Sequence, residues 1–177
     1  MMEVSIVTVG ELETNCYLLD IDNEVLIVDP GAEYKKIKLA LYGRKVLGIL
    51  ITHFHSDHIG ALKEFKDIPV YSFSNLEEKE YHIGKFNFEV MFNPGHTKDS
   101  VSYYFKEFNA LFCGDFIFYH SVGRWDLATG NLDDLIKSVK KVRQLPEYTI
   151  IYPGHGRKTT MEEENKNNGF FNGGFNE

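Results

Sequence analysis

The chain has 177 residues, 43% of them hydrophobic and 25% charged, values that are ordinary for a soluble globular protein with a substantial core. Its 19 basic and 26 acidic residues give a net charge of −7, and no basic run or stripe indicates a nucleic-acid-binding protein. We find no signal-peptide pattern and no apolar run near the roughly 18 residues of a membrane span, so we expect a cytoplasmic protein without nucleic-acid or membrane partners.

Apolar patterns predict most of the secondary structure. The expected strands share runs of apolar residues bounded by turn residues, and they span 4–9, 16–21, 24–29, 46–52, 69–73, 85–93, 101–106, 110–115 and 148–153. Helical spacing of apolar residues predicts helices at 31–43, 58–65 and 132–145. Cys16 and Cys113 each lie inside an apolar segment, and we expect two buried free thiols rather than a disulfide, as in a reducing cytoplasm.

The order of these elements predicts the architecture. Strands, a helix, a strand, a helix, several strands, a helix and a final strand favour an α+β sandwich of sheets with helices outside, rather than a doubly wound parallel sheet. We expect one catalytic domain at 1–160. The Asn- and Gly-rich ending is typical of a disordered tail, but we expect 161–177 to be an extension that packs on the domain through Phe170 and Phe171.

Three histidines and an aspartate crowd into six positions of the sequence THFHSDH, directly after an apolar strand. Alternate residues at a strand end face the same way, so His53, His55 and Asp57 are expected to converge on one point, while His58 turns towards a second point nearby. This spacing suits two metal ions side by side. The alternative is that Ser56 or Asp57 caps the following helix and that one of the histidines is structural.

Single potential ligands follow three later strands. His96 lies in the sequence NPGHT, Asp115 ends the sequence FCGD, and His155 lies in YPGHG, where glycines let the backbone bend tightly. Either histidine alone is compatible with an ordinary loop residue, but the shared placement of all three favours a common site. His82 matches no ligand position and is expected at the surface, whereas His120 is considered as a residue facing the pocket.

The pattern THxHxDH, followed by single His, Asp and His residues at successive strand ends, resembles the metallo-β-lactamase superfamily from about Val4 to Thr160. The resemblance implies a four-layer αββα sandwich with a dinuclear site at one edge. Asp29, in VDPG, matches an aspartate expected to orient a ligand histidine, although a plain Asp-Pro-Gly turn is the alternative. The implied ligands are His53, His55 and His96 for one ion, Asp57, His58 and His155 for the other, and Asp115 as the bridge.

The resemblance also implies a reaction. Two ions would bring the pKa of a shared water towards neutrality and so supply a bridging hydroxide as the nucleophile, while the remaining positive charge stabilises an oxyanion. Asp57 and Asp115 are the expected catalytic carboxylates. The ligand types suit two divalent ions, with Zn expected and Fe or Mn tolerated. The implied activity is that of a metal-dependent hydrolase.

Within the superfamily, the chain is most similar to the short, single-domain form of glyoxalase II, a hydrolase of the thioester S-lactoylglutathione. Superfamily ribonucleases carry an inserted domain, β-lactamases are normally exported, and flavodiiron proteins have Glu where His55 stands. The ending GHGRKTT before acidic residues favours the short hydrolases. The alternatives are a persulfide dioxygenase, which binds one iron through two histidines and an aspartate, and a non-enzymatic metal-binding protein.

The sequence SVGRWD offers one candidate for substrate binding. Arg124 lies at the offset after Asp115 where two-domain glyoxalase II has a lysine that grips glutathione, but Asp126 stands where that enzyme has a tyrosine. The resemblance therefore makes Arg124 a candidate contact for a small acidic thioester. A structural ion pair between Arg124 and Asp126 is the alternative.

Overall fold

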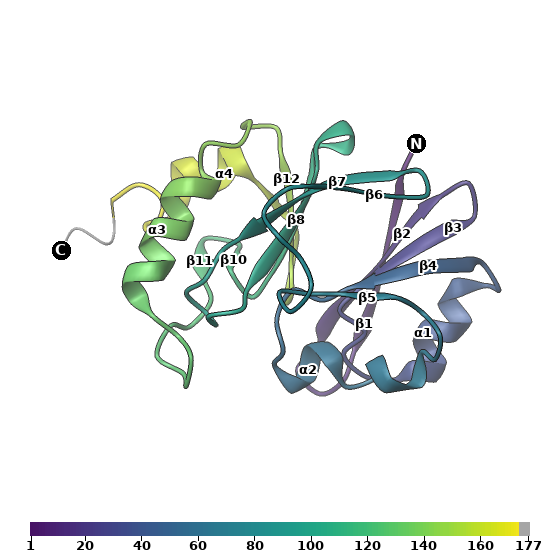
Figure 1. The fold of residues 1–177 in the computed structure, drawn as a ribbon. Coiled ribbons are helices and arrows are strands. Elements are labelled where there is room, and N and C mark those ends of the chain that lie inside the picture. The colour runs from purple at the N-terminus through teal and green to yellow at the C-terminus, as the bar shows by residue number, and fades with distance from the viewer. Residues whose placement is uncertain (174–177) are drawn as a thin grey trace.

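Two β-sheets face each other at the centre of the computed structural model, which describes residues 1–173 (Figure 1). The first sheet has the order β1-β2-β3-β4-β5, with strands β1 (Glu3–Val9), β2 (Thr14–Ile21), β3 (Glu24–Val28), β4 (Lys45–Leu50) and β5 (Val70–Tyr71). The second has the order β13-β12-β9-β8-β7-β6, with strands β6 (Glu80–Ile83), β7 (Phe86–Phe92), β8 (Val101–Phe105), β9 (Ala110–Gly114), β12 (Ile150–Pro153) and β13 (Thr159–Thr160). A separate ribbon pairs β10 (Ile117–Phe118) with β11 (Ser121–Val122).

Helices cover the outer faces of both sheets (Figure 1). They are α1 (Tyr34–Leu41) and the short α2 (Ser56–Ile59) on the first sheet, and α3 (Leu132–Val142) and α4 (Met161–Asn167) on the second. Two 3-10 turns, η1 (Leu62–Glu64) and η2 (Lys106–Phe108), complete the elements. The layers are therefore those of the predicted α+β sandwich, with helices outside two sheets.

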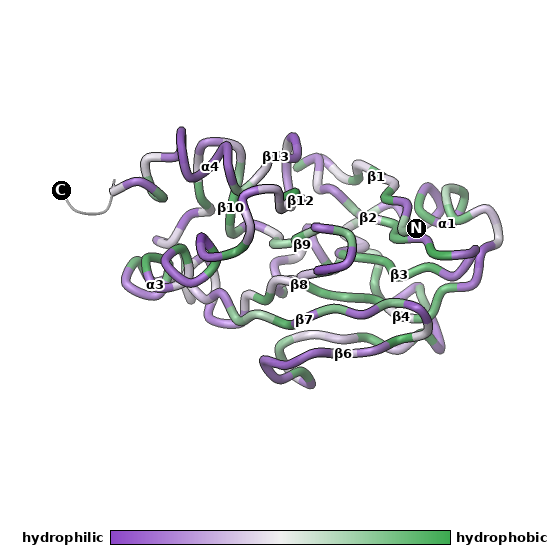
Figure 2. Tube along the Cα trace, turned by 90° about the horizontal axis from the view of Figure 1, so that it is seen from above, coloured by the Kyte–Doolittle hydropathy of each residue, from purple (hydrophilic) through white to green (hydrophobic). Residues whose placement is uncertain are grey.

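Strand β2 illustrates why the layers form. All but one of its residues are buried, because its alternate side chains enter two different cores. Cys16 and Leu18 pack in the outer core with residues of α1, whereas Tyr17 and Leu19 pack in the core between the sheets. A strand covered on both faces needs a continuous apolar run, which Figure 2 shows along the central strands.

The second outer core depends on α3 and the C-terminal segment. The helix begins after Asn131, whose side chain accepts a hydrogen bond from the Asp134 amide. Its buried residues Leu135, Val139 and Val142 recur at helical spacing and pack with residues of the second sheet. Sequence patterns place this helix correctly at its start and extend it slightly too far at its end.

The C-terminal segment also enters this core. Met161 and Phe171 are buried there, and Phe170 packs against it at the margin. Met161, Phe170 and Phe171 thus contribute to the second outer core, while the last four residues of the predicted extension lie outside the described part. The division of the chain at residue 160 stays a prediction.

Two helix predictions are corrected. The expected helix at 58–65 is interrupted, because the Ala61 amide donates to the Pro30 carbonyl oxygen at 3.0 Å instead of continuing the helical hydrogen bonds. The backbones are in contact there, so the chain forms α2 and η1 as separate turns. The helix expected at 31–43 begins only at Tyr34, because Glu33 adopts the left-handed conformation.

Several short elements were not predicted: β6, β10, β11, β13, η2 and α4. The expectation for the cysteines is confirmed, since Cys16 and Cys113 are both free and buried. Within residues 1–173, none of the helices combines the length and apolar character that crossing a membrane requires.

Candidate metal centre

The candidate ligands meet because the strands that precede them end at one edge of the sandwich. Strand β12 runs parallel to β9, with Pro153 beside Gly114, so His155 and Asp115 leave the second sheet as neighbours. His53 follows β4 of the first sheet. The two sheets are joined at this edge by a hydrogen bond from the Val101 amide to the Thr52 carbonyl oxygen, 2.8 Å long.

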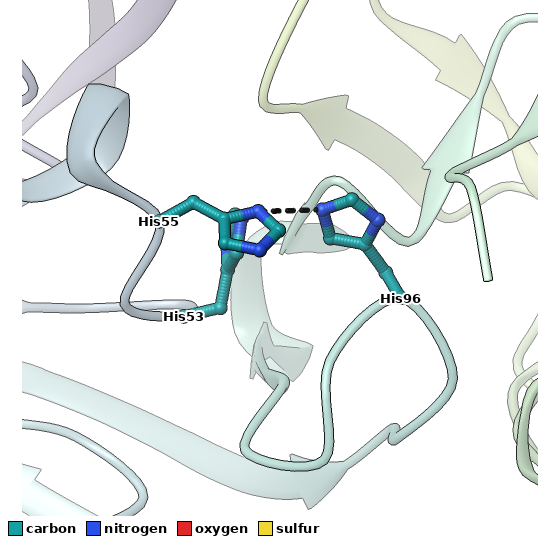
Figure 3. A group of neighbouring side chains, drawn as sticks. All are labelled: His53, His55 and His96. Carbon is teal, nitrogen blue, oxygen red and sulfur yellow. Dashed lines mark hydrogen bonds between the residues drawn. The ribbon is translucent and has the colours of Figure 1, made fainter. Parts of the chain in front are cut away.

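Two groups of side chains lie at this edge. His53, His55 and His96 form the first group (Figure 3). Asp57, His58, Asp115 and His155 form the second, and within each group one potential ligand atom of every residue lies within 4.8 Å of those of the others. In Figure 3, the rings of His55 and His96 point towards each other, with 3.1 Å between His55 Nδ1 and His96 Nε2.

One expectation about this grouping is corrected. Strand alternation placed Asp57 with His53 and His55, but Asp57 lies in the second group. The strand ends at Leu50 and α2 begins at Ser56, so the period of two no longer applies at Asp57. The grouping instead follows the assignment implied by the resemblance.

Asp115 lies between the two groups. Its Oδ2 atom is 3.8 Å from His53 Nε2 and 3.6 Å from His96 Nε2. In the second group, Oδ2 is 3.3 Å from His155 Nε2, and Oδ1 is 3.2 Å from His58 Nε2. Among the candidate ligands, Asp115 is thus the residue whose carboxylate contacts both groups.

Backbone carbonyl groups hold two of the histidines. His96 Nδ1 lies 2.7 Å from the Arg124 carbonyl oxygen, and His155 Nδ1 lies 2.9 Å from that of Leu12. A carbonyl oxygen only accepts hydrogen bonds, so both Nδ1 atoms carry the proton. In the neutral rings, the Nε2 atoms that face Asp115 are then the atoms that carry the lone pair.

Asp29 holds two more histidines in the same tautomer. The carboxylate, 1% exposed, accepts from His58 Nδ1 at 2.8 Å and from the Thr52 hydroxyl at 2.6 Å. That hydroxyl has a single proton, which it donates to Asp29 in a hydrogen bond. The contact of 3.0 Å between Thr52 Oγ1 and His53 Nδ1 therefore requires His53 to donate. Asp29 therefore contacts His58 directly and His53 through Thr52, and its role in orienting a ligand histidine stays a prediction.

The donor set suits metal cations. His53 Nε2 is buried and has no hydrogen-bond partner among the described residues, and the buried atoms His58 Nε2 and Asp115 Oδ1 have only ion-pair contacts, such as the 3.2 Å between them. Buried polar atoms of this kind are costly unless another group satisfies them. Imidazole nitrogens and carboxylate oxygens are the ligands of zinc, iron and manganese. The residues present thus fit the implied ions.

The ionisation of these groups also favours positive charge at this edge. Burial lowers the pKa of His53 and of His96, which keeps their rings neutral. Burial also opposes charge on His58, but Asp29 and Asp115 outweigh it and raise the pKa of His58 to about 12. A cation placed beside His58 Nε2 would meet the same carboxylates that attract this proton.

Gly154 lets the backbone approach the candidate metal centre closely. A Cβ atom on Gly154 would lie 2.1 Å from Asp115 Oδ1 and 2.7 Å from His58 Cε1. No side chain fits there without displacing a candidate ligand, so the glycine of the sequence YPGHG is required by close approach.

The remaining sequence candidates lie outside both groups. The Arg124 side chain forms a bidentate ion pair with Asp126, with distances of 3.0 and 3.1 Å, and only its carbonyl group contacts a candidate ligand. His82 is exposed, as expected. His120 does not face the two groups: it is exposed, and its Nε2 atom lies 2.6 Å from Glu163 Oε1.

Two threonines were not predicted. Thr52 precedes the histidine cluster directly, and Thr14 donates a hydrogen bond of 2.9 Å to Asp57 Oδ2. Thr52 could have been found from its place beside His53, because a hydroxyl can relay a hydrogen bond from a carboxylate. Thr14 is 43 residues from Asp57, and no local pattern links the two.

Known proteins are similar to this chain in sequence and in fold. The model of the metallo-beta-lactamase superfamily matches residues 9–72 and 66–155. The probable metallo-hydrolase YqgX of Bacillus subtilis is 37% identical, over 93% of this chain and 95% of that protein. The hydroxyacylglutathione hydrolase GloC of Haemophilus influenzae is 28% identical, over 97% of this chain and 99% of that protein.

Solved structures agree with these relatives. The BLEG-1 B3 metallo-beta-lactamase superposes with a TM-score of 0.91 at 35% identity, over 97% of this chain and 100% of the other. TTHA1623 in a di-iron-bound form gives 0.83 at 34%, over 93% and 98%, and ETHE1 from Myxococcus xanthus gives 0.84 at 30%, over 94% and 83%. By sequence and by its four-layer αββα fold, the chain belongs to the metallo-beta-lactamase superfamily.

Proposed function

We propose that this protein is a dinuclear metal-dependent hydrolase. The proposal rests on two groups of side chains with Asp115 between them. Within each group, one potential ligand atom of every residue lies within 4.8 Å of those of the others. The first ion would be held by His53, His55 and His96. The second would be held by Asp57, His58 and His155, with Asp115 shared by both.

When bound, the two ions would activate a water as a nucleophile and polarise the bond under attack. The chain's own residues prepare the ligands for this task. Asp29, Thr52 and the carbonyl groups of Arg124 and Leu12 keep protons on Nδ1 of four histidines. The Nε2 lone pairs are thereby directed to the centre without rearrangement. Asp57 and Asp115 supply the negative charge that retains the cations.

We further propose a small acidic thioester as the substrate, as in glyoxalase II. Support comes from GloC, a hydroxyacylglutathione hydrolase that aligns over 99% of its own length. The two-domain relatives align over less of theirs, for example 66% of the Hamiltonella defensa hydroxyacylglutathione hydrolase. The Arg124 side chain is proposed to contact this substrate, for which it would have to release Asp126.

The alternative activity is a mononuclear iron persulfide dioxygenase, and the ETHE1 neighbour is compatible with it. Zinc is the ion that we propose for the hydrolase, although the di-iron form of TTHA1623 shows iron in a related protein. A non-enzymatic metal-binding protein is the remaining alternative.

Elemental analysis and two assays distinguish these functions. The hydrolase is expected to carry close to two metal ions per chain and to release free thiol from S-lactoylglutathione without consuming oxygen. One tightly held iron with oxygen uptake on glutathione persulfide would instead establish the dioxygenase. A β-lactam should be tested in parallel, because BLEG-1 is described as a B3 metallo-beta-lactamase. Metal binding without turnover of any of these compounds would contradict the enzymatic proposal.

A further inference from the structure

A depression of about 380 Å3 lies between Tyr119 and the segment that follows His155. Arg157 and Lys158 line one side, and they follow His155 directly in the chain, so that Arg157 Cα lies within about 7 Å of His155 Cα. Tyr119 lines the other side. Its neighbour Phe118 places its ring 6.1 Å from the ring of His155. The depression therefore lies close to His155, although none of the candidate ligands lines it.

Both cations of the depression are available to a ligand. The Arg157 guanidinium lies 4.1 Å above the centre of the Tyr119 ring, and Lys158 Nζ lies 5.9 Å from the centre of the Tyr152 ring. Rings hold cations in place without neutralising them. Within residues 1–173, neither cation lies within ion-pair distance of a carboxylate, in contrast to Arg124, which Asp126 engages with two hydrogen bonds.

The depression carries net positive charge. Glu163 is its one carboxylate among the lining residues, and other groups already engage it: His120 Nε2 at 2.6 Å and Asn167 Nδ2 at 2.9 Å. Arg157 and Lys158 outweigh this carboxylate by one charge. A local positive site on a chain of net charge −7 selects an anionic group while the rest of the surface repels it.

We propose that Arg157 and Lys158 bind a carboxylate of the thiol carrier, with Tyr119 as the platform that positions Arg157. This inference rests on the proposed thioester hydrolase for its choice of ligand. The planar guanidinium group suits two parallel hydrogen bonds to a carboxylate. The carrier would lie along the depression while the acyl group reaches the metal centre past His155.

Binding can be measured apart from turnover with S-methylglutathione, a thioether that carries two carboxylates and is not hydrolysed. Calorimetry on the metal-loaded protein should give a Kd that rises about 10 to 100-fold in the double variant R157Q/K158Q, as expected for the loss of charge-assisted hydrogen bonds. The matched control is K38Q. Lys38 is exposed on α1 and lies 5.7 Å from the Tyr34 ring, so it reproduces the loss of a ring-bound cation elsewhere on the surface.

A kinetic comparison separates this inference from the proposed function. The ratio of kcat/KM for S-lactoylglutathione to that for the lactoyl thioester of uncharged N-acetylcysteamine should fall about 10 to 100-fold in R157Q/K158Q and stay constant in K38Q. Equal Kd values in wild type and double variant, or no binding by the wild type, would overturn the inference. If the Kd values differ but neither thioester is cleaved, the carrier site stands and the proposed hydrolase fails.

Discussion

Asp29 offers the sharpest test of how the candidate metal centre is organised. Its carboxylate accepts three hydrogen bonds, from the Thr52 amide at 2.8 Å, the Thr52 hydroxyl at 2.6 Å and His58 Nδ1 at 2.8 Å. In the variant Asp29→Asn, the amide oxygen can still accept from the Thr52 amide. The amide nitrogen, which replaces Oδ2, is itself a donor. It faces two other donors, the Thr52 hydroxyl and His58 Nδ1.

The simplest relaxation of this variant reverses both tautomers. His58 would accept at Nδ1 and move its proton to Nε2, and the Thr52 hydroxyl would turn to donate to His53 Nδ1, with the same result. The neutral rings would then carry their proton on Nε2, so metal binding would require a change of tautomer in addition to the loss of any charge on the ring. Loss of such an orienting partner weakens metal affinity by about 10 to 100-fold, or about 1.4 to 2.7 kcal/mol per ion.

A second variant separates the change in affinity for one ion from the change in affinity for the other. Thr52→Val removes the hydroxyl that accepts from His53, while the bond between Asp29 and His58 remains. It should therefore weaken only the ion held by the group of His53. Competition of the metal-free protein with a chromophoric chelator for zinc yields both dissociation constants.

Glu164→Gln is the matched control for the loss of a buried carboxylate. Glu164 is fully buried and accepts hydrogen bonds from Thr159 Oγ1 at 2.7 Å, Asn168 Nδ2 at 2.7 Å and the His120 amide at 3.0 Å, away from the candidate ligands. Its variant should bind both ions normally. Unchanged affinity for both ions in Asp29→Asn would refute the tautomer argument.

Four further outcomes follow from the same geometry. Asp115→Ala should abolish turnover and lower metal content at both positions, and elemental analysis that shows a single loss would contradict its shared role. Because the pKa of His58 is raised to about 12, metal binding must displace a proton, so affinity should rise about tenfold per pH unit around neutrality, with proton uptake by the buffer as the calorimetric readout. Glu164→Ala should lower the free energy of unfolding by about 3 kcal/mol, since it orphans three donors, as chemical denaturation can test. Arg124→Ala should raise KM about tenfold with metal content preserved, and an unchanged KM would assign its charge to the pair with Asp126 alone.

The candidate ligands could be predicted because their signal is local. A cluster such as THFHSDH and single residues at strand ends are visible in the sequence, and glycines such as Gly154 mark the turns that need close approach. The grouping of Asp57 could not be derived from strand alternation, because α2 begins one residue after His55 and changes the direction of the side chains. The alternation of side-chain directions holds only within a strand, so it predicts nothing about residues beyond the strand's end.

The groups that hold the histidines carry less signal. His96 and His155 are fixed by carbonyl groups of Arg124 and Leu12, and every residue has such a group, so no residue type marks it. Edge strands are equally hard to find. The strand β6 has the sequence EYHI, half exposed, and it pairs only with β7 within the second sheet. Tertiary pairing, rather than its composition, makes it a strand.

The family match ends just before the two cations of the proposed carrier site. The match ends at residue 155 and includes all seven candidate ligands, whereas Arg157 and Lys158 come after it. The segment beyond the match also contacts the turn that carries Tyr119, because Glu164 of α4 accepts a hydrogen bond from the amide of His120. One fold can serve many substrates when such segments vary around a constant centre. Substrate choice is therefore expected to follow Arg157, Lys158 and α4, while metal binding follows the matched residues.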